Sequence, residues 1–143
     1  MTPGRLLGVA YFADENALGL AKLLIRSGRT DIVHPGHPSL PDVPLGSSDL
    51  EWMPFVGRAD LIVRTRDRRI RTRPAELAEY RRLGIRSVWI GAKQDLSPQD
   101  QLDIFLAGEH RLERTAVKLG AGPWALAMSP SGVRPIRGGG AEV

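Results

Sequence analysis

The sequence predicts an α/β fold, a three-layer α/β/α sandwich with a mainly parallel central sheet. One observation is a series of apolar runs of strand length, at Leu6–Phe12, Asp31–His34, Leu61–Thr65, Ser87–Ile90 and Trp124–Met128. Another is that segments with helical periodicity lie between these runs, and several of them end at a glycine. Strands that alternate with helices usually pair in parallel, and the helices then cover the sheet.

The apolar run Leu6–Phe12 predicts the first strand. The N-terminus lacks the long apolar core and the small-residue cleavage site of a signal peptide, so it is interpreted as the start of this strand. A helix is predicted over Glu15–Ser27, with Gly28 as its stop. The segment His34–Ser48 then interrupts the alternation. It contains four prolines and two glycines and is therefore predicted to be a loop, and loops of this length are often functional.

The second half of the chain carries clear helix signals. A short helix is predicted to begin at Asp49, before the strand Leu61–Thr65. Pro74–Leu83 has a proline in its first turn and is followed by Gly84. The last helix is predicted to begin after Ser97 as N-cap and to end at Gly120. We predict a single domain over residues 1–137 and a flexible tail over residues 138–143.

Composition excludes several classes of protein. The 143 residues are 42% hydrophobic and 25% charged, as in a globular domain. The absence of cysteine excludes disulfides, zinc–thiolate sites and thiol nucleophiles, and fits a cytoplasmic protein. No apolar run is long enough to cross a membrane, so no membrane partner is expected. Motifs of serine hydrolases and nucleotide-binding loops are absent.

An arginine cluster surrounds a single acid, Asp67. The net charge is +4, and six arginines fall within Arg64–Arg73. Arginine suits phosphate because its planar guanidinium donates two parallel hydrogen bonds. We predict that substrate phosphates are bound by Arg66, Arg68, Arg69, Arg71 and Arg73; the alternative is a solvated turn.

Acidic side chains follow the predicted strands or begin the next helix. Asp14 and Glu15 follow the first strand, Asp49 opens a helix, and Asp67 follows Leu61–Thr65. Ligands of parallel α/β sheets gather at the carboxyl ends of the strands. Carboxylates that converge there repel one another unless they share a cation, and their oxygens suit Mg²⁺ or Mn²⁺. The alternative is that each acid caps a helix or turn.

Several segments that contain these acids and arginines resemble the PIN-like nucleases. The resemblance lies in "FADEN", "DIVHPG", the helix from Asp49 and "LIVRTRDRRIRTRPAEL", and extends from Leu6 to about Gly91. The branch that it most resembles is that of the VapC-type toxins of toxin–antitoxin pairs. The resemblance implies RNA cleavage with Mg²⁺ or Mn²⁺, by Asp14, Asp49 and Asp67, with Thr65 beside the substrate. It also implies an antitoxin partner and a homodimer.

One departure from the family pattern bears on activity. Many PIN nucleases carry a further glutamate on a helix between the first two of these acids, where this chain has its proline-rich loop. Glu15, which we include among the metal ligands, or Glu51 is the candidate to replace it. A second hypothesis is therefore an inactive domain that binds RNA or protein. A third is a phosphoacceptor domain with Asp14 as acceptor, although Lys118 lies within a helix, where it fits poorly.

Three further residues are candidates for binding. His34 and His37 lie in "HPGH", but no third soft ligand for zinc is near them in the sequence. Trp52 lies beside Asp49 and is the tryptophan that we consider as a platform for RNA bases.

Overall fold

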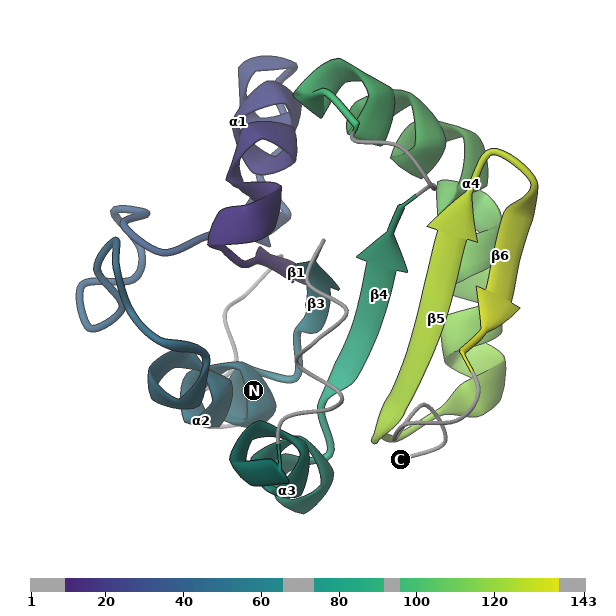
Figure 1. Cartoon of the computed structure of the whole chain (residues 1–143). Helices are drawn as coiled ribbons and strands as arrows, with labels where there is room; N and C mark the ends of the chain where they lie inside the picture. Colours follow the sequence, from purple (N-terminus) through teal and green to yellow (C-terminus); the bar gives the residue numbers. More distant parts are fainter. Residues whose placement is uncertain (1–9, 66–73, 92–95, 137–143) are drawn as a thin grey trace.

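The computed structural model describes residues 10–65, 74–91 and 96–136. They form one six-stranded sheet, in the order β2-β1-β3-β4-β5-β6, with helices on both faces (Figure 1). The strands are β1 (Tyr11–Ala13), β2 (Ile32–Val33), β3 (Ile62–Thr65), β4 (Arg86–Ile90), β5 (Trp124–Ser129) and β6 (Gly132–Pro135). The helices are the 3-10 helix η1 (Glu15–Ala17), α1 (Leu18–Arg26), α2 (Asp49–Ala59), α3 (Pro74–Leu83) and α4 (Pro98–Leu119). No helix within these ranges is long and apolar enough to cross a membrane.

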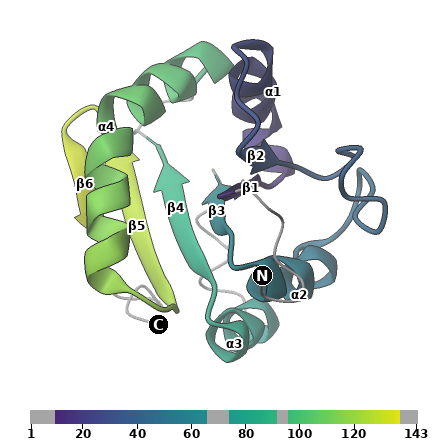
Figure 2. The ribbon, with the colours of Figure 1, turned by 180° about the vertical axis from the view of Figure 1, so that it is seen from behind.

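The predicted α/β sandwich is confirmed by two apolar cores, one on each face of the sheet. Helices α1 and α4 cover one face, and α2 and α3 cover the other (Figures 1 and 2). Side chains alternate along β1, so Tyr11 and Ala13 enter the first core and Phe12 enters the second. The pairs β1–β2, β1–β3, β3–β4 and β4–β5 are parallel, as predicted.

The strand β6 was not predicted and pairs antiparallel with β5 at the edge of the sheet. It is short and polar, and its residues Arg134 and Pro135 are exposed, so it lacks the apolar alternation of a half-buried strand. An edge strand tolerates proline because one side needs no backbone donor.

The proline-rich segment His34–Ser48 contains no helix or strand, as predicted, but it is anchored to the protein core. Leu40 and Val43 are each only 3% exposed and pack with α2 and β3. Successive turns connect them, since Leu40 N–H donates to the His37 carbonyl at 2.8 Å and Val43 N–H to the Leu40 carbonyl at 3.1 Å. The buried side chains and the turn hydrogen bonds therefore hold this loop in place beside the carboxyl end of β1.

A group of charged residues connects β2 to α4. The Arg29 guanidinium donates two hydrogen bonds to Asp31, at 2.9 and 2.7 Å, and two to Glu109, at 3.0 and 2.6 Å. The Tyr11 hydroxyl donates to Glu109 at 3.4 Å. Burial raises the pKa of the Asp31 carboxyl, but the hydrogen bonds and charge of Arg29 outweigh burial, and the pKa lies below its ordinary value.

Replacing Arg29 with methionine should reduce the free energy of unfolding near pH 7 by about 1–2 kcal/mol, because two half-buried carboxylates lose their shared donor. Since the folded pKa of Asp31 is lowered, its part of this stabilisation is present above the ordinary aspartate pKa. It is lost as the pH falls through the lowered folded value. Urea denaturation near neutral pH and near pH 3 measures both effects.

Arg82→Met is the matched control, because Arg82 forms a bidentate pair with Glu79 on the exposed surface of α3. We expect a much smaller loss of stability from this variant. Equal losses in the two variants would show that the Arg29 network stabilises no more than a surface pair.

Candidate functional site

Asp14 lies at the carboxyl end of β1 and is only 2% exposed. Its backbone N–H donates to the carbonyl of Arg64 in β3, at 3.1 Å, so the sheet fixes its position. The residue occupies the N-cap position of η1, but its side chain forms no capping hydrogen bond. Capping therefore does not account for this aspartate.

Asp49 is the first residue of α2, and the helix is capped by its neighbour. The Ser48 hydroxyl accepts from Glu51 N–H at 3.3 Å, and the Glu51 carboxylate accepts from Ser48 N–H at 2.8 Å. This capping box leaves the Asp49 side chain for another contact. Its Oδ1 accepts a hydrogen bond from the Trp52 indole Nε1 at 3.2 Å.

Trp52 supports the site from beneath. It is 1% exposed and packs on Phe12 with the ring centroids 4.9 Å apart. The expectation of a platform for RNA bases is therefore wrong, because the indole faces are covered by the core. Phe12 precedes Asp14 by two residues, so this ring pair packs the strand that bears Asp14 against the helix that bears Asp49.

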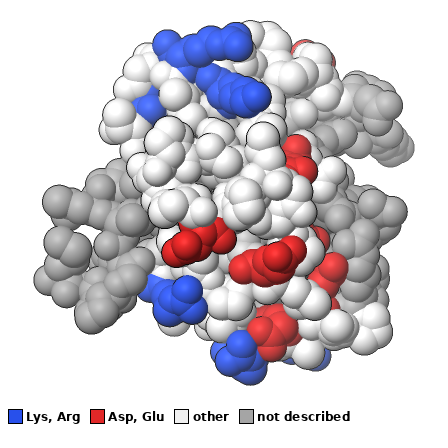
Figure 3. Space-filling model, turned by 90° about the vertical axis from the view of Figure 1, so that its left-hand side faces the viewer, with Lys and Arg blue, Asp and Glu red and all other residues white. Residues whose placement is uncertain are grey.

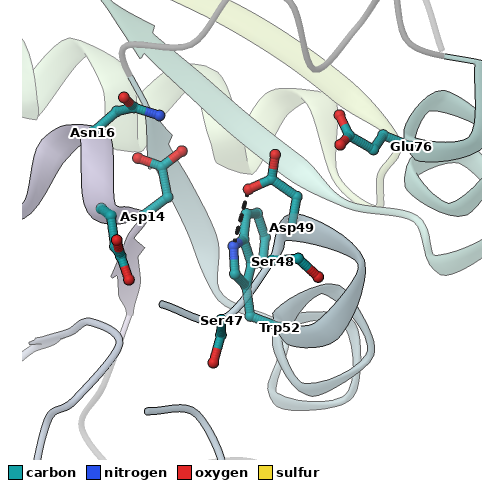
Figure 4. A pocket seen from close by; sticks show the side chains of 8 residues that line it. Asp14, Asn16, Ser47, Ser48, Asp49, Trp52 and Glu76 are labelled. Atoms are coloured by element: carbon teal, nitrogen blue, oxygen red, sulfur yellow. Dashed lines mark hydrogen bonds between the residues drawn. The ribbon is translucent and has the colours of Figure 1, made fainter. Parts of the chain in front are cut away.

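The two aspartates line one pocket of about 370 Å³. In Figure 4 the carboxylates of Asp14 and Asp49 point toward the same side of this pocket, and Glu76 of α3 lies beyond Asp49. The remaining lining residues are Glu15, Asn16, Ser47, Ser48 and Trp52. The structure thus brings together Asp14, Asp49 and Glu15 from the predicted set.

Glu76 was not predicted, although the sequence contained a signal. It is an acid in the first turn of α3. A helix that leads into the next parallel strand begins at the carboxyl edge of the sheet, where ligands gather. An acid in the first turn of such a helix therefore lies at the same edge of the sheet as an acid at a strand end.

Both candidate replacement glutamates contact backbone amides. The Glu15 carboxylate accepts a hydrogen bond from Gly46 N–H and also lines the pocket. Glu51 is exposed, does not line this pocket, and accepts from Ser48 N–H. The backbone and side-chain hydrogen bonds of Ser48 lower the pKa of Glu51 below its ordinary value.

The end of β3 divides the arginine cluster. Arg64 is fully buried, and its guanidinium lies 4.0 Å from the ring centroid of Tyr11 and 3.2 Å from that of Phe105. Thr65 is 3% exposed and does not line the described pocket. The other predicted residues, Asp67 and Arg66, Arg68, Arg69, Arg71 and Arg73, lie outside the described part of the chain.

A divalent cation would find oxygen donors at this pocket, but the described residues do not complete a site. Among residues 10–65, 74–91 and 96–136, no group of three or more His, Cys, Asp or Glu side chains could hold a metal ion. Asp14 and Asp49 supply two carboxylates of the type that Mg²⁺ prefers. The predicted third carboxylate is that of Asp67. Acidic side chains (red) also gather on the face shown in Figure 3, with basic ones (blue) mainly above and below.

The histidines of "HPGH" form a local pair. The rings of His34 and His37 are 5.2 Å apart, edge to face. The His34 Nδ1 lies 2.8 Å from the Pro35 carbonyl, and the His37 Nδ1 accepts from Ser39 N–H at 3.0 Å. Burial and the neighbouring His34 lower the pKa of His37. These contacts shape the loop.

Comparison with known proteins gave one family. The family model described as "PIN like domain" matches residues 10–92, which include β1 to β4 and the pocket. No curated protein and no solved structure matches the chain.

Proposed function

This chain belongs to the PIN-like domain family, and we propose that it is an endoribonuclease that hydrolyses RNA phosphodiester bonds with Mg²⁺ or Mn²⁺. PIN-like domains are generally nucleases. The observation that carries the proposal is that Asp14 and Asp49, from separate elements, line one polar pocket at the carboxyl edge of the sheet.

We assign the cation to Asp14, Asp49 and Asp67. The sequence also predicts Glu15 as a ligand, but in the structure its carboxylate accepts the hydrogen bond from Gly46 N–H, and we do not assign the cation to it. The oxygen donors on this side of the pocket suit a hard cation. A divalent cation bound there supplies positive charge that stabilises the phosphoryl group during hydrolysis. The chain itself holds the donors in place: the β1–β3 pairing fixes Asp14, and the Trp52 indole orients Asp49.

RNA is the proposed substrate, because the net charge of +4 and the arginines after β3 favour a polyanion. Thr65 and Arg66 are the residues nearest to Asp67 in the sequence. We propose that phosphates further along the RNA are contacted by Arg68, Arg69, Arg71 and Arg73. Arginine contacts of this kind position the nucleic acid and are not specific for sequence.

The biological role that we propose is that of a toxin in a toxin–antitoxin pair. The support is the order of "FADEN", the helix from Asp49 and "TRD", which resembles the PIN-like branch of VapC-type toxins. A cognate antitoxin would then bind at the acidic pocket or at the arginine segment, and a homodimer is expected.

A second candidate function is a domain that binds RNA or protein without cleavage. It is favoured by the place of Glu51, which accepts from Ser48 N–H in the capping box and does not line the pocket, so Glu51 does not replace the missing family glutamate there.

The test is cleavage of RNA by the purified chain over a titration of Mg²⁺ and Mn²⁺. Asp14→Asn and Asp49→Asn keep the side-chain shape but remove the charge. Each should lower the cleavage rate by about 100-fold or more, because an electrostatic contact at the reacting centre is lost. Asp67→Asn should do the same.

Asp103→Asn on the exposed surface of α4 is the control, and it should cleave at the wild-type rate. Circular dichroism and thermal unfolding show whether each variant is folded. Undiminished cleavage by a folded Asp14→Asn variant would contradict the metal assignment. RNA binding without cleavage by the wild-type chain would favour the second function.

Trp52→Phe tests the support of Asp49. The phenyl ring retains most of the packing on Phe12, but the indole N–H to Asp49 Oδ1 is lost. Residues that orient a metal ligand typically change affinity by 10- to 100-fold when removed. We therefore expect about tenfold weaker Mn²⁺ binding, measured by calorimetry.

The matched control is Trp124→Phe, which removes an indole hydrogen bond of 3.0 Å to the Gly120 carbonyl and lies outside the pocket. It should lower stability without changing Mn²⁺ affinity. Equal Mn²⁺ affinities in the two variants would count against a specific role for the Trp52–Asp49 bond.

A further inference from the structure

The two aspartates of the pocket come from segments that are far apart in the sequence. Asp14 ends β1, whereas Asp49 begins α2 after the loop. Their relative position therefore depends on contacts between these segments. Beneath the pocket the contact is the packing of Phe12 on Trp52, with the ring centroids 4.9 Å apart.

At the pocket itself a directional contact joins the same segments. The carboxylate of Glu15, the residue after Asp14, accepts a hydrogen bond from the backbone N–H of Gly46. Gly46 has a φ of +87°, a conformation that glycine adopts readily, so the amide direction is set by the turn.

The bonded glycine is connected to Asp49 through a short, braced segment. The Ser47 hydroxyl donates to the Pro44 carbonyl at 2.7 Å, and the capping box of Ser48 and Glu51 fixes the start of α2. Gly46 is thus three residues from Asp49, and Glu15 is one residue from Asp14. The Glu15–Gly46 hydrogen bond joins the two ends of the segment 15–46. One pocket carboxylate lies just outside each end, Asp14 before Glu15 and Asp49 after Gly46.

We propose that Glu15 is a positioning residue that fixes Asp14 relative to Asp49, a role that rests on the proposed metal-dependent function. In this role Glu15 acts through its bond to Gly46, and its charge is not needed as a metal ligand. The loop residues Ser47 and Ser48 form a wall of the same pocket, so the bond also fixes the width of the opening that the substrate enters.

Two substitutions of Glu15 separate this role from metal ligation. Gln retains a carbonyl oxygen that can accept from Gly46 N–H, but it lacks the charge that a metal ligand needs. Ala lacks both. The readouts are amide exchange of Gly46 by NMR, Mn²⁺ affinity by calorimetry, and the kcat and KM of RNA cleavage. Glu113→Ala, exposed on α4, is the control.

If Glu15 positions the aspartates, the hydrogen-exchange rate of the Gly46 amide should be about tenfold higher in Glu15→Ala than in the wild type. Glu15→Ala should also bind Mn²⁺ about tenfold more weakly. Glu15→Gln should stay within about threefold of the wild type in both measurements, with cleavage largely retained.

Two outcomes would overturn the proposal. In the first, Glu15→Ala and Glu15→Gln lose the same Mn²⁺ affinity, although the Gly46 amide of Glu15→Gln exchanges at the wild-type rate. Glu15 would then be a metal ligand. In the second, Gly46 exchange is unchanged in Glu15→Ala. A wild-type chain that neither binds Mn²⁺ nor cleaves RNA would refute the proposed function, and Gly46 exchange alone would then decide whether the bond fixes the loop.

Discussion

The parallel pairing of β1 with β3 is the constraint on which the candidate site depends. Because Tyr11 pairs with Ile62 and Phe12 with Val63 in the same direction, both strands end at one edge of the sheet. A helix that leads into a parallel strand runs opposite to it and begins at that edge. The start of α2 therefore brings Asp49 beside Asp14, and the start of α3 brings Glu76. One topological feature thus gathers acids from three elements.

The same strand pair places a positive charge inside the protein. Arg64 is fully buried, and desolvation lowers its pKa to about 9. Desolvation also raises the pKa of Tyr11 to about 12. Each aromatic face contributes about 2 kcal/mol to a desolvated cation, which offsets only part of a burial penalty of several kcal/mol per ion. Arg64 belongs to the core beside α4, where its guanidinium contacts Phe105, and not to a phosphate-binding surface.

The sequence predicted the elements better than it predicted their contacts. Strands and helices with strong periodicity, such as β5 and α4, were found because their patterns are local. The burial of Leu40 and Val43 was missed, since proline and glycine indicate a loop but not what the loop packs on. Asp14 and Asp49 were predicted from their places at element ends. Trp52 was not recognised as their support, because its orientation depends on the pairing of distant segments.

Several carboxylates at and near the pocket accept hydrogen bonds from the protein itself. Like charges raise the free energy of such a cluster unless each charge has a compensating contact. Here Asp49 accepts from the indole N–H of Trp52, and Glu15 accepts from the Gly46 amide. Glu51, which lies outside the pocket, accepts from the Ser48 amide. These donors stabilise the carboxylates and also fix their directions. A cation that binds at Asp14 and Asp49 would thus meet donors oriented in advance, with little further loss of side-chain entropy.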